Sequence, residues 1–341
     1  MQFLHNYWYV AARAEEVGDT PLARTILDEA IVMFRGPDGK AIALEDRCCH
    51  RHLPLSEGAV VDGTIRCGYH GLRFDGTGAC IEVPGQTRVP PGALVKSYPV
   101  IERHPFVWLW MGDPAAADPA ALIDFPWFEA PGRRERGELF HANCNYALLV
   151  DNLMNFTHLT YVHGTTIGNA AVTDSAEVTT KRDGDRVRIE RNMHDVPPPP
   201  TYAAAGGIVG NVDRFQRIQF TPPSYVWVNA GVVPLEDGGS NGLAKGVALE
   251  RHTLHAITPE TGRSTHYFWA TAHDLNTYDE AAMELMHDEF CTAFTEDLGI
   301  LEAQQKSMER HPGAPSIDTN NDSGGLEVTR ILERLIAAEA A

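Results

Sequence analysis

Two short segments of the chain pair cysteine with histidine. The first contains Cys48 and His50, and after a gap of sixteen residues the second contains Cys67 and His70. A [2Fe–2S] cluster held by two cysteines on one iron and two histidines on the other needs this set, and its imidazole ligands raise its reduction potential. Glycines flank the second pair, and glycine lets backbone N–H groups come close to the cluster sulfurs. We therefore predict that these four residues bind a [2Fe–2S] cluster.

A structural zinc site is the main alternative for this set of residues, because it also uses two cysteines and two histidines. A zinc finger keeps its cysteines together and its histidines together, whereas here the two types alternate along the chain. The other alternative is four unrelated residues, and a doubled pattern on loops argues against it. The sequence favours the cluster.

Polar side chains interrupt a mostly apolar helix predicted over residues 147–158. Asn152, Asn155 and His158 recur every three residues, which would place them along one side of such a helix. His163 follows five residues after His158, directly before a glycine that could end the helix, and two such histidines can converge on one ion. Two histidines alone are a weak signal, because buried histidines are more often satisfied by hydrogen bonds.

A second predicted helix, over residues 278–309, adds a carboxylate to this pair. Asp297 falls within its apolar stripe, seven residues after Phe290 and three after Phe294. A buried carboxylate must be paired or bind a metal ion, so a salt bridge to an arginine is the alternative. With His158 and His163 it completes the two-histidine, one-carboxylate set of non-heme Fe(II) oxygenases, which leaves coordination positions open for O2. A one-electron store and an oxygen-activating iron in one chain predict an oxygenase.

The elements around these residues indicate two domains, as the length of 341 residues also does. Residues 1–113 predict a small all-β domain, because short apolar or alternating runs are separated by glycine and proline turn signals. The alanine, aspartate and proline-rich stretch up to residue 119 reads as a linker. Residues 114–341 predict an α+β catalytic domain, an antiparallel sheet with a long C-terminal helix, in which the prolines at 197–200 interrupt the run of strands.

Charge and composition limit the partners of the protein. The formal net charge is −18, which argues against nucleic acid or an anionic membrane surface as a partner. No signal peptide or membrane-spanning run is visible, and the remaining four cysteines lack the spacing of a disulfide framework. We therefore expect a cytoplasmic protein.

The chain resembles the Rieske non-heme iron aromatic oxygenases over essentially its full length. The single-component members are the most similar: the vanillate O-demethylase oxygenase subunit, toluenesulfonate methyl-monooxygenase and dicamba O-demethylase. The segments that carry the resemblance are residues 6–12, the two cluster loops, and residues 80–86, 148–163, 257–261 and 302–305.

This resemblance implies a Rieske domain followed by a helix-grip catalytic domain, assembled as a head-to-tail homotrimer. It also implies that electrons come from NAD(P)H through a separate flavin/[2Fe–2S] reductase, since the chain has no glycine-rich dinucleotide loop in the required context. Respiratory Rieske proteins carry an extra cysteine in each cluster loop, whereas these loops contain only Cys49. The oxygenase-type cluster is therefore expected.

Asn155 departs from the family pattern. Three residues before the first iron-binding histidine, the family usually has an aspartate that bridges the two metal centres. An amide has one acceptor oxygen beside a donor nitrogen, so Asn155 could satisfy only one of two bridged imidazoles well. We expect Asn155 to remain at the bridge with slower or retuned electron transfer. Asn152 or Asp151 could take over instead, or Asn155 could be an engineered replacement.

Two further positions match substrate-contacting positions of dicamba O-demethylase, namely Gln216 and His255. Both could hold a carboxylate, a sulfonate or a phenol, although sheet pairing is the alternative for each. An aromatic pocket could also include Trp227, Phe268 and Trp269, which core packing explains equally well.

The predicted function is a monooxygenase that hydroxylates a methoxy or methyl group on an aromatic ring bearing an anionic substituent. O-demethylation is the first choice. Methyl hydroxylation of an aryl sulfonate, ring hydroxylation, N-demethylation and a pure electron carrier are the alternatives.

Overall fold

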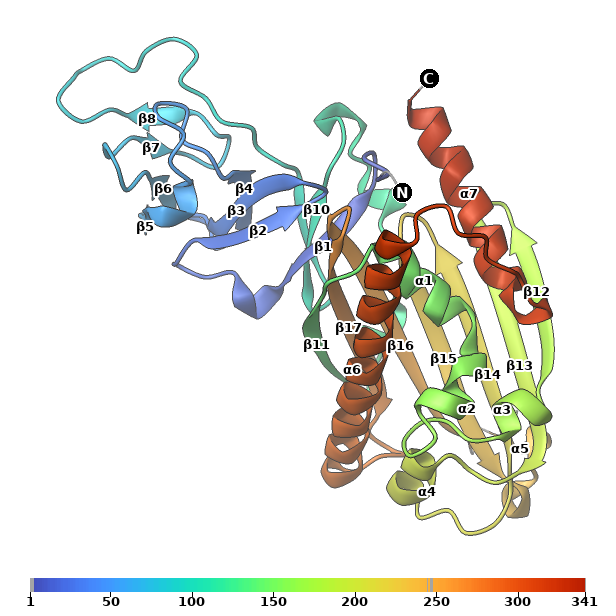
Figure 1. The fold of residues 1–341 in the computed structure, drawn as a ribbon. Helices are drawn as coiled ribbons and strands as arrows, with labels where there is room; N and C mark the ends of the chain where they lie inside the picture. Colours follow the sequence, from blue (N-terminus) through green and yellow to red (C-terminus); the bar gives the residue numbers. More distant parts are fainter. Residues whose placement is uncertain (1–2, 244, 246–247, 341) are drawn as a thin grey trace. The chain divides into compact units, whose positions relative to one another are not determined.

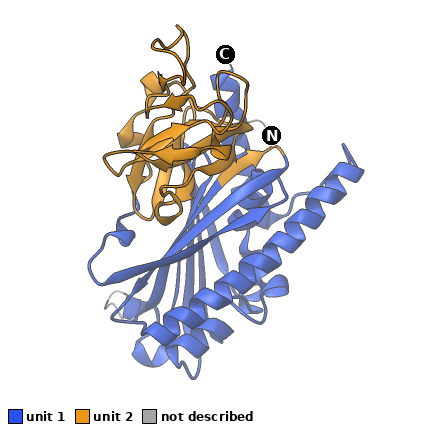
Figure 2. Ribbon diagram, turned by 90° about the vertical axis from the view of Figure 1, so that its left-hand side faces the viewer, with its two compact units in different colours: residues 1, 125–257, 263–341 blue, residues 2–124, 258–262 orange. Residues whose placement is uncertain are grey.

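The structure is a computed structural model that describes residues 3–243, 245 and 248–340. The chain divides into two compact units (Figure 2). One comprises Gln2–Asp124 with Thr258–Gly262, and the other comprises Phe125–Ile257 with Arg263–Ala341. The compact unit extends to Asp124. The domain boundary after residue 113 stays a prediction.

The unit that contains the N-terminal segment is built from short strands in three sheets, which confirms the predicted all-β class. Its strands are ordered β1-β10-β9, β2-β3-β4 and β5-β6-β7-β8. The bounds are β1 (Trp8–Arg13), β2 (Leu22–Ile26), β3 (Glu29–Arg35), β4 (Ala41–Glu45), β5 (Ala59–Val61), β6 (Thr64–Arg66), β7 (Arg73–Phe74), β8 (Cys80–Glu82), β9 (Val100–Arg103) and β10 (Phe106–Trp110).

The other unit is one seven-stranded sheet in the order β11-β17-β16-β15-β14-β13-β12, with helices on one face (Figure 1). The strands are β11 (Arg133–Ala142), β12 (Glu177–Asp183), β13 (Arg186–Val196), β14 (Val212–Thr221), β15 (Tyr225–Pro234), β16 (Leu249–Thr261) and β17 (Ser264–Asp274). The helices are α1 (Tyr146–Met154), α2 (Leu159–Val162), α3 (Ala171–Asp174), α4 (Pro200–Gly206), α5 (Ser240–Leu243), α6 (Glu280–Arg310) and α7 (Ser323–Glu339). The predicted antiparallel sheet with a long helix is confirmed.

Helix α6 forms where the sequence predicts it, because capping and amphipathicity agree. The Asp279 side chain accepts a hydrogen bond from the Ala282 backbone N–H at 2.8 Å and so caps its N-terminus. Its apolar stripe is buried, and Asp297 within that stripe is only 5 % exposed. The helix therefore carries a carboxylate into the interior.

The helix predicted over residues 147–158 is shorter than expected. α1 ends at Met154, and Asn155 has an extended backbone (φ −133°, ψ 97°) before a single 3-10 turn, η6 (Phe156–His158). The Asn155 side chain accepts from the Thr157 backbone N–H at 3.1 Å, and such local bonds compete with a continuous helix. The three polar residues predicted along one helix side therefore do not share a single helix.

Helix α7 is an addition that the sequence analysis did not predict. Its first turn contains Gly324 and Gly325, which are poor helix formers. A Cβ at Gly325 would lie 2.1 Å from Oδ1 of Asp151 on α1, so that side chain would have to move. The residues after the two glycines are mostly good helix formers, and Val328, Ile331 and Leu332 form a buried stripe at helical spacing, so the sequence did carry a signal for this helix.

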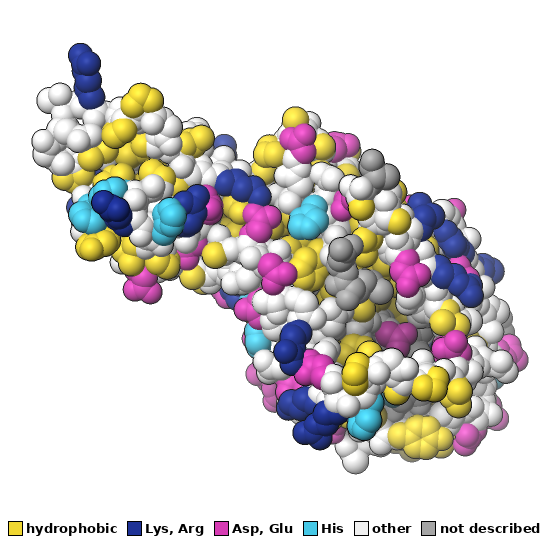
Figure 3. All heavy atoms as spheres, turned by 45° about the horizontal axis from the view of Figure 1, so that its top comes forward, with side chains coloured by type: hydrophobic (Ala, Val, Ile, Leu, Met, Phe, Trp, Pro, Cys, Tyr) yellow, Lys and Arg dark blue, Asp and Glu magenta, His cyan; other side chains and the backbone are white. Residues whose placement is uncertain are grey.

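No helix within the described ranges is both long enough and apolar enough to cross a membrane. On the face drawn in Figure 3, acidic and basic side chains are interspersed rather than gathered by sign.

Candidate metal centres and substrate pocket

The two cysteine–histidine loops have the same backbone construction. The Cys48 N–H donates to the Leu53 carbonyl at 2.8 Å, and the Cys67 N–H donates to the Leu72 carbonyl at 2.8 Å. The residue four positions after each cysteine returns a bond to the cysteine carbonyl and has positive φ: 61° at His52 and 76° at Gly71. Two matching turns thus present one cysteine and one histidine each.

The side chains of these loops fit the predicted cluster. Cys48 and Cys67 are buried, whereas His50 and His70 are exposed and their ring centroids lie 4.6 Å apart. Burial raises the pKa of Cys48 to about 11, and the neighbouring Cys67 adds to this, so iron would supply the positive charge that two buried thiolates need. All six cysteines are free, which matches the expected lack of a disulfide between the loops.

In the other unit, the side chains of His158, His163 and Asp297 converge. Asp297 Oδ1 lies 3.1 Å from His163 Nε2 and 3.5 Å from His158 Nε2. One ligand atom from each residue can be chosen so that all three lie within 4.8 Å of one another. His158 ends η6, His163 follows α2 and Asp297 lies on α6, so three separate elements build the set.

Hydrogen bonds to the other nitrogen orient both imidazole rings. His158 Nδ1 lies 2.7 Å from the Asn155 backbone oxygen, and His163 Nδ1 lies 2.8 Å from Glu296 Oε2. If these nitrogens donate, each Nε2 is left as a lone pair facing Asp297, as a metal ligand requires. Burial lowers the pKa of His158; it also acts against charge on His163, whose pKa is nevertheless raised by Asp297 and Glu296.

Asn152 supplies an independent sign that this site fits a metal ion. Its Nδ2 donates to Asp297 Oδ1 at 3.1 Å, while its Oδ1 is buried without a hydrogen-bond partner. A buried amide oxygen without a partner is costly, and the amide group that carries it donates to Asp297, the carboxylate of the set. The donor set suits ferrous iron.

Asn155 touches the site through its backbone. Its carbonyl faces His158 Nδ1, but its side chain is engaged elsewhere: Nδ2 donates to Asp322 Oδ1 at 2.7 Å, and Oδ1 accepts from the Thr157 hydroxyl at 2.6 Å. The predicted bridging role of this side chain stays a prediction.

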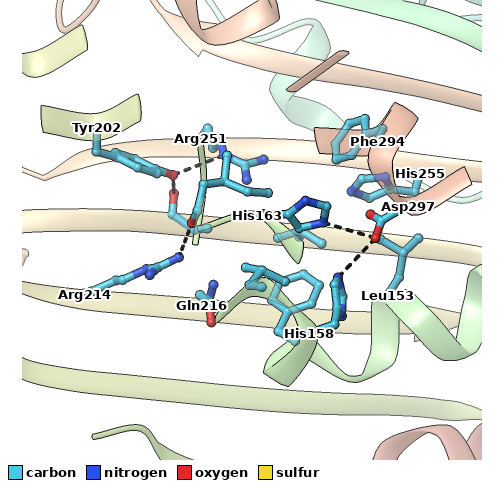
Figure 4. A pocket seen from close by; sticks show the side chains of 15 residues that line it. Leu153, His158, His163, Tyr202, Arg214, Gln216, Arg251, His255, Phe294 and Asp297 are labelled. Carbon is cyan, nitrogen blue, oxygen red and sulfur yellow. Dashed lines mark hydrogen bonds and ion pairs between the residues drawn. The ribbon is translucent and has the colours of Figure 1, made fainter. Parts of the chain in front are cut away.

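A cavity adjoins the three converging side chains (Figure 4). Both Gln216 and His255 line it. Burial lowers the pKa of His255 to about 3, so this ring is neutral, with Nδ1 2.7 Å from the Tyr267 hydroxyl. Gln216 Oε1 is buried and has no hydrogen-bond partner.

Of the two alternatives for Trp227, Phe268 and Trp269, the structure supports core packing over a place in the cavity wall. The residues lining the cavity do not include Trp227, Phe268 or Trp269. Trp227 stacks on Trp127 with ring centroids 5.0 Å apart, and the other two are core residues.

Two buried arginines of the cavity wall, Arg214 and Arg251, were missed by the sequence analysis. Arginine within a strand is usually read as a surface residue. Side chains alternate across a strand, so residues an even number of positions apart share one face. Arg214 therefore shares a face of β14 with Gln216, and Arg251 shares a face of β16 with His255. This spacing relative to the two predicted substrate contacts was the available signal.

A cysteine–histidine set on twin loops, together with two histidines and a carboxylate beside a cavity, defines an oxygenase with two iron centres. The Rieske [2Fe-2S] domain family matches residues 7–99, and the vanillate O-demethylase oxygenase C-terminal domain family matches residues 142–338. The chain therefore belongs to the Rieske non-heme iron oxygenases with a catalytic domain of the vanillate O-demethylase type. Its cofactors are a Rieske [2Fe–2S] cluster and a mononuclear non-heme iron.

Curated relatives are similar over nearly their whole length. A vanillate O-demethylase oxygenase subunit of a Pseudomonas species is 40% identical, covering 99% of this chain and 96% of the relative. A toluene-4-sulfonate monooxygenase iron-sulfur subunit of Comamonas testosteroni is 37% identical, covering 99% and 98%.

Solved structures agree with this family. Dicamba monooxygenase bound to dicamba superposes with a TM-score of 0.91 at 34% identity, covering 100% of this chain and 99% of that one. A structure of dicamba monooxygenase with non-heme iron and dicamba has a TM-score of 0.80 at 32% identity, with the same coverage.

Proposed function

We propose that Cys48, His50, Cys67 and His70 hold the Rieske cluster. The matching turns support this, because they bury two thiols and place the two imidazoles side by side at the surface. We further propose that His158, His163 and Asp297 hold the non-heme iron, with Asn152 beside them. Their convergence within 4.8 Å, together with the hydrogen bond that Asn152 donates to Asp297, supports this set.

The proposed reaction is hydroxylation of a methoxy or methyl group on an aromatic ring that bears an anionic substituent. The cavity beside His158, His163 and Asp297 is the observation that carries it. When bound, the cluster supplies single electrons and the iron activates O2. A methoxyarene, O2, two electrons and two protons would give a hemiacetal and water, and the hemiacetal breaks down to a phenol and formaldehyde.

The side chains of the cavity would orient the substrate. Gln216 offers a buried amide oxygen without a partner, and the neutral ring of His255 is fixed by Tyr267. Apolar side chains, among them Leu153, Phe156 and Phe294, line the same cavity and would exclude water from the ring. We propose Gln216 and His255 as substrate contacts.

The partner of an oxygenase component is a separate reductase. We propose a flavin/[2Fe–2S] enzyme that draws on NAD(P)H, together with a head-to-tail homotrimer in the cytoplasm. In such a trimer the cluster of one subunit serves the iron of its neighbour, with Asn155 between them. The resemblance to the family supports this arrangement.

Turnover of a panel of methoxybenzoates with a reductase and NADH tests the reaction. We expect formaldehyde and the matching phenol in equal amounts, each dependent on O2. Peroxide without formaldehyde across the panel would contradict O-demethylation.

Methyl hydroxylation of an aryl sulfonate is the second candidate, favoured by the similarity to the toluene-4-sulfonate monooxygenase subunit. Formation of the benzyl alcohol from 4-toluenesulfonate identifies it. A cis-diol from either substrate would instead indicate ring dihydroxylation.

A further inference from the structure

The cavity wall contains two guanidinium groups that have only neutral partners. Arg251 Nε donates to the Tyr202 hydroxyl at 3.1 Å, and its Nη1 donates to the Thr253 hydroxyl at 2.7 Å. Arg214 Nη2 donates to the Ile167 carbonyl at 2.8 Å. Among the residues that the structure describes, no carboxylate lies within salt-bridge distance of either guanidinium.

These hydrogen bonds fix the position of Arg251. Its guanidinium carbon also lies 4.1 Å from the ring centroid of Phe290 on α6, so one face of the group is covered. Within the described part of the chain, Nη2 of Arg251 has no hydrogen-bond acceptor. The group is held rigidly, and one nitrogen is left to bind a ligand.

A buried positive charge without a counter-ion is unfavourable. Burial lowers the pKa of Arg214 to about 10, and the nearby charges of Arg251 and Arg191 act in the same direction. Arg214 remains charged at neutral pH, because a pKa of 10 is still far above it. This part of the cavity therefore attracts an anion.

We infer that Arg251 and Arg214 form an oxyanion subsite that binds the carboxylate or sulfonate of the substrate ring. This rests on the proposed function of the cavity. In Figure 4, Arg214 lies on the side of the cavity opposite His158 and Asp297, with Gln216 between them in this view and Arg251 next to Tyr202. An acid group bound there directs the opposite end of the ring toward the proposed iron ligands.

A guanidinium can donate to two oxygens of a carboxylate or to two of the three oxygens of a sulfonate, and each charge-assisted bond adds to affinity. Gln216 and His255 are uncharged and contribute hydrogen bonds only. The two arginines therefore determine the preference for an acidic over a neutral ligand. Gln216 and His255 determine how the ring of the ligand is oriented.

Matched acid and neutral ligands test the subsite. The probes are 4-methoxybenzoate against 4-methoxybenzamide, and 4-toluenesulfonate against 4-toluenesulfonamide. Dissociation constants are measured by calorimetry on the fully metallated protein without O2. We expect at least one of the acids to bind about 10- to 100-fold more tightly than its neutral partner.

Substitution should remove this preference selectively. In Arg251→Met and Arg214→Met, the ratio of acid to neutral affinity should fall toward one, while affinity for the neutral ligand, which also reports correct folding, changes by less than about threefold. Arg251→Lys keeps the charge and should retain part of the ratio. Arg217→Met is the control, because Arg217 lies over Phe215 at 4.7 Å, outside the cavity, and should leave the ratio unchanged.

The inference is overturned if the parent protein binds acid and neutral ligands equally, or binds neither acid. It is also overturned if both methionine variants keep the full ratio. Formaldehyde from the neutral ligand at a rate equal to that from the acid would reject the subsite and leave the oxygenase function standing. Binding with the expected ratio of acid to neutral affinity, but without any oxygenated product, would reject the oxygenase function and leave the subsite standing.

Discussion

Asn155 connects the proposed iron site to the segment before α7 through a single carboxylate. Its Nδ2 donates to Asp322 Oδ1 at 2.7 Å, while Asp322 Oδ2 accepts from the backbone N–H and the hydroxyl of Thr319, at 2.5 and 2.8 Å. Burial acts to raise the pKa of Asp322, but these hydrogen bonds outweigh it and the pKa is lowered. The family usually has a carboxylate at position 155. In this chain the nearby carboxylate is that of Asp322, which accepts a hydrogen bond from Asn155.

We expect Asn155→Asp to be destabilising, because two carboxylates would then meet at hydrogen-bonding distance. The lost charge-assisted bond corresponds to about 1–3 kcal/mol, and repulsion adds to it. A lower urea midpoint would show this, and the double variant Asn155→Asp, Asp322→Asn should recover most of the loss. Equal midpoints for the single and double variants would contradict the pairing. In parallel, equal single-turnover yields and rates for Asn155→Asp and the parent would remove Asn155 from the electron path.

At the scale of elements, the turn after α2 determines where His163 points. The His163 carbonyl accepts from the backbone N–H of Gly168 at 2.9 Å and from that of Thr166 at 3.1 Å. A Cβ on Gly168 would lie 1.8 Å from the Leu159 carbonyl oxygen, so the backbone would have to move. A Cβ on Gly164 would meet nothing closer than the Thr160 carbonyl at 3.4 Å.

We therefore expect Gly168→Ala to lose most of its mononuclear iron while its visible cluster spectrum is retained. Gly164→Ala is the matched control and should keep both metals. Iron analysis with absorption spectroscopy measures the two outcomes. Full iron content in Gly168→Ala would mean that this turn does not position His163.

The elements predicted correctly from the sequence are those marked by nearby residues, namely turn residues, a helix cap or an apolar stripe. The strands of the cluster-binding unit lie between turn residues, and α6 follows its cap and stripe, so Asp297 was recognisable as a buried carboxylate. The break after α1 depends on a side-chain hydrogen bond at Asn155, which the regular spacing of the polar residues does not reveal, whereas α7 was missed although its apolar residues have helical spacing. Arg214 and Arg251 were missed because a strand pattern does not tell which polar face is covered by helices.

At the scale of the molecule, the two proposed metal sites belong to different units, so their metals should be lost independently. We expect about three irons per chain in the parent, one in Cys67→Ser and two in His163→Ala. Cys291→Ser is the control for cysteine replacement and should keep three. Mass spectrometry of iron together with the EPR signal of the reduced cluster measures this. Two irons in the parent would instead fit an electron carrier.

The last residues of β16, together with Gly262, belong to the cluster-binding unit, although they lie more than a hundred residues further along the chain. There the Thr258 hydroxyl donates to the Val10 carbonyl at 2.6 Å, and the carbonyls of Pro259 and Glu260 accept from the N–H groups of Leu27 and Asp28 at 2.9 Å each. During synthesis these acceptors emerge from the ribosome long after the turn between β2 and β3 to which they bind. A fragment cut at residue 124 therefore leaves the backbone N–H groups of Leu27 and Asp28 without their native acceptors.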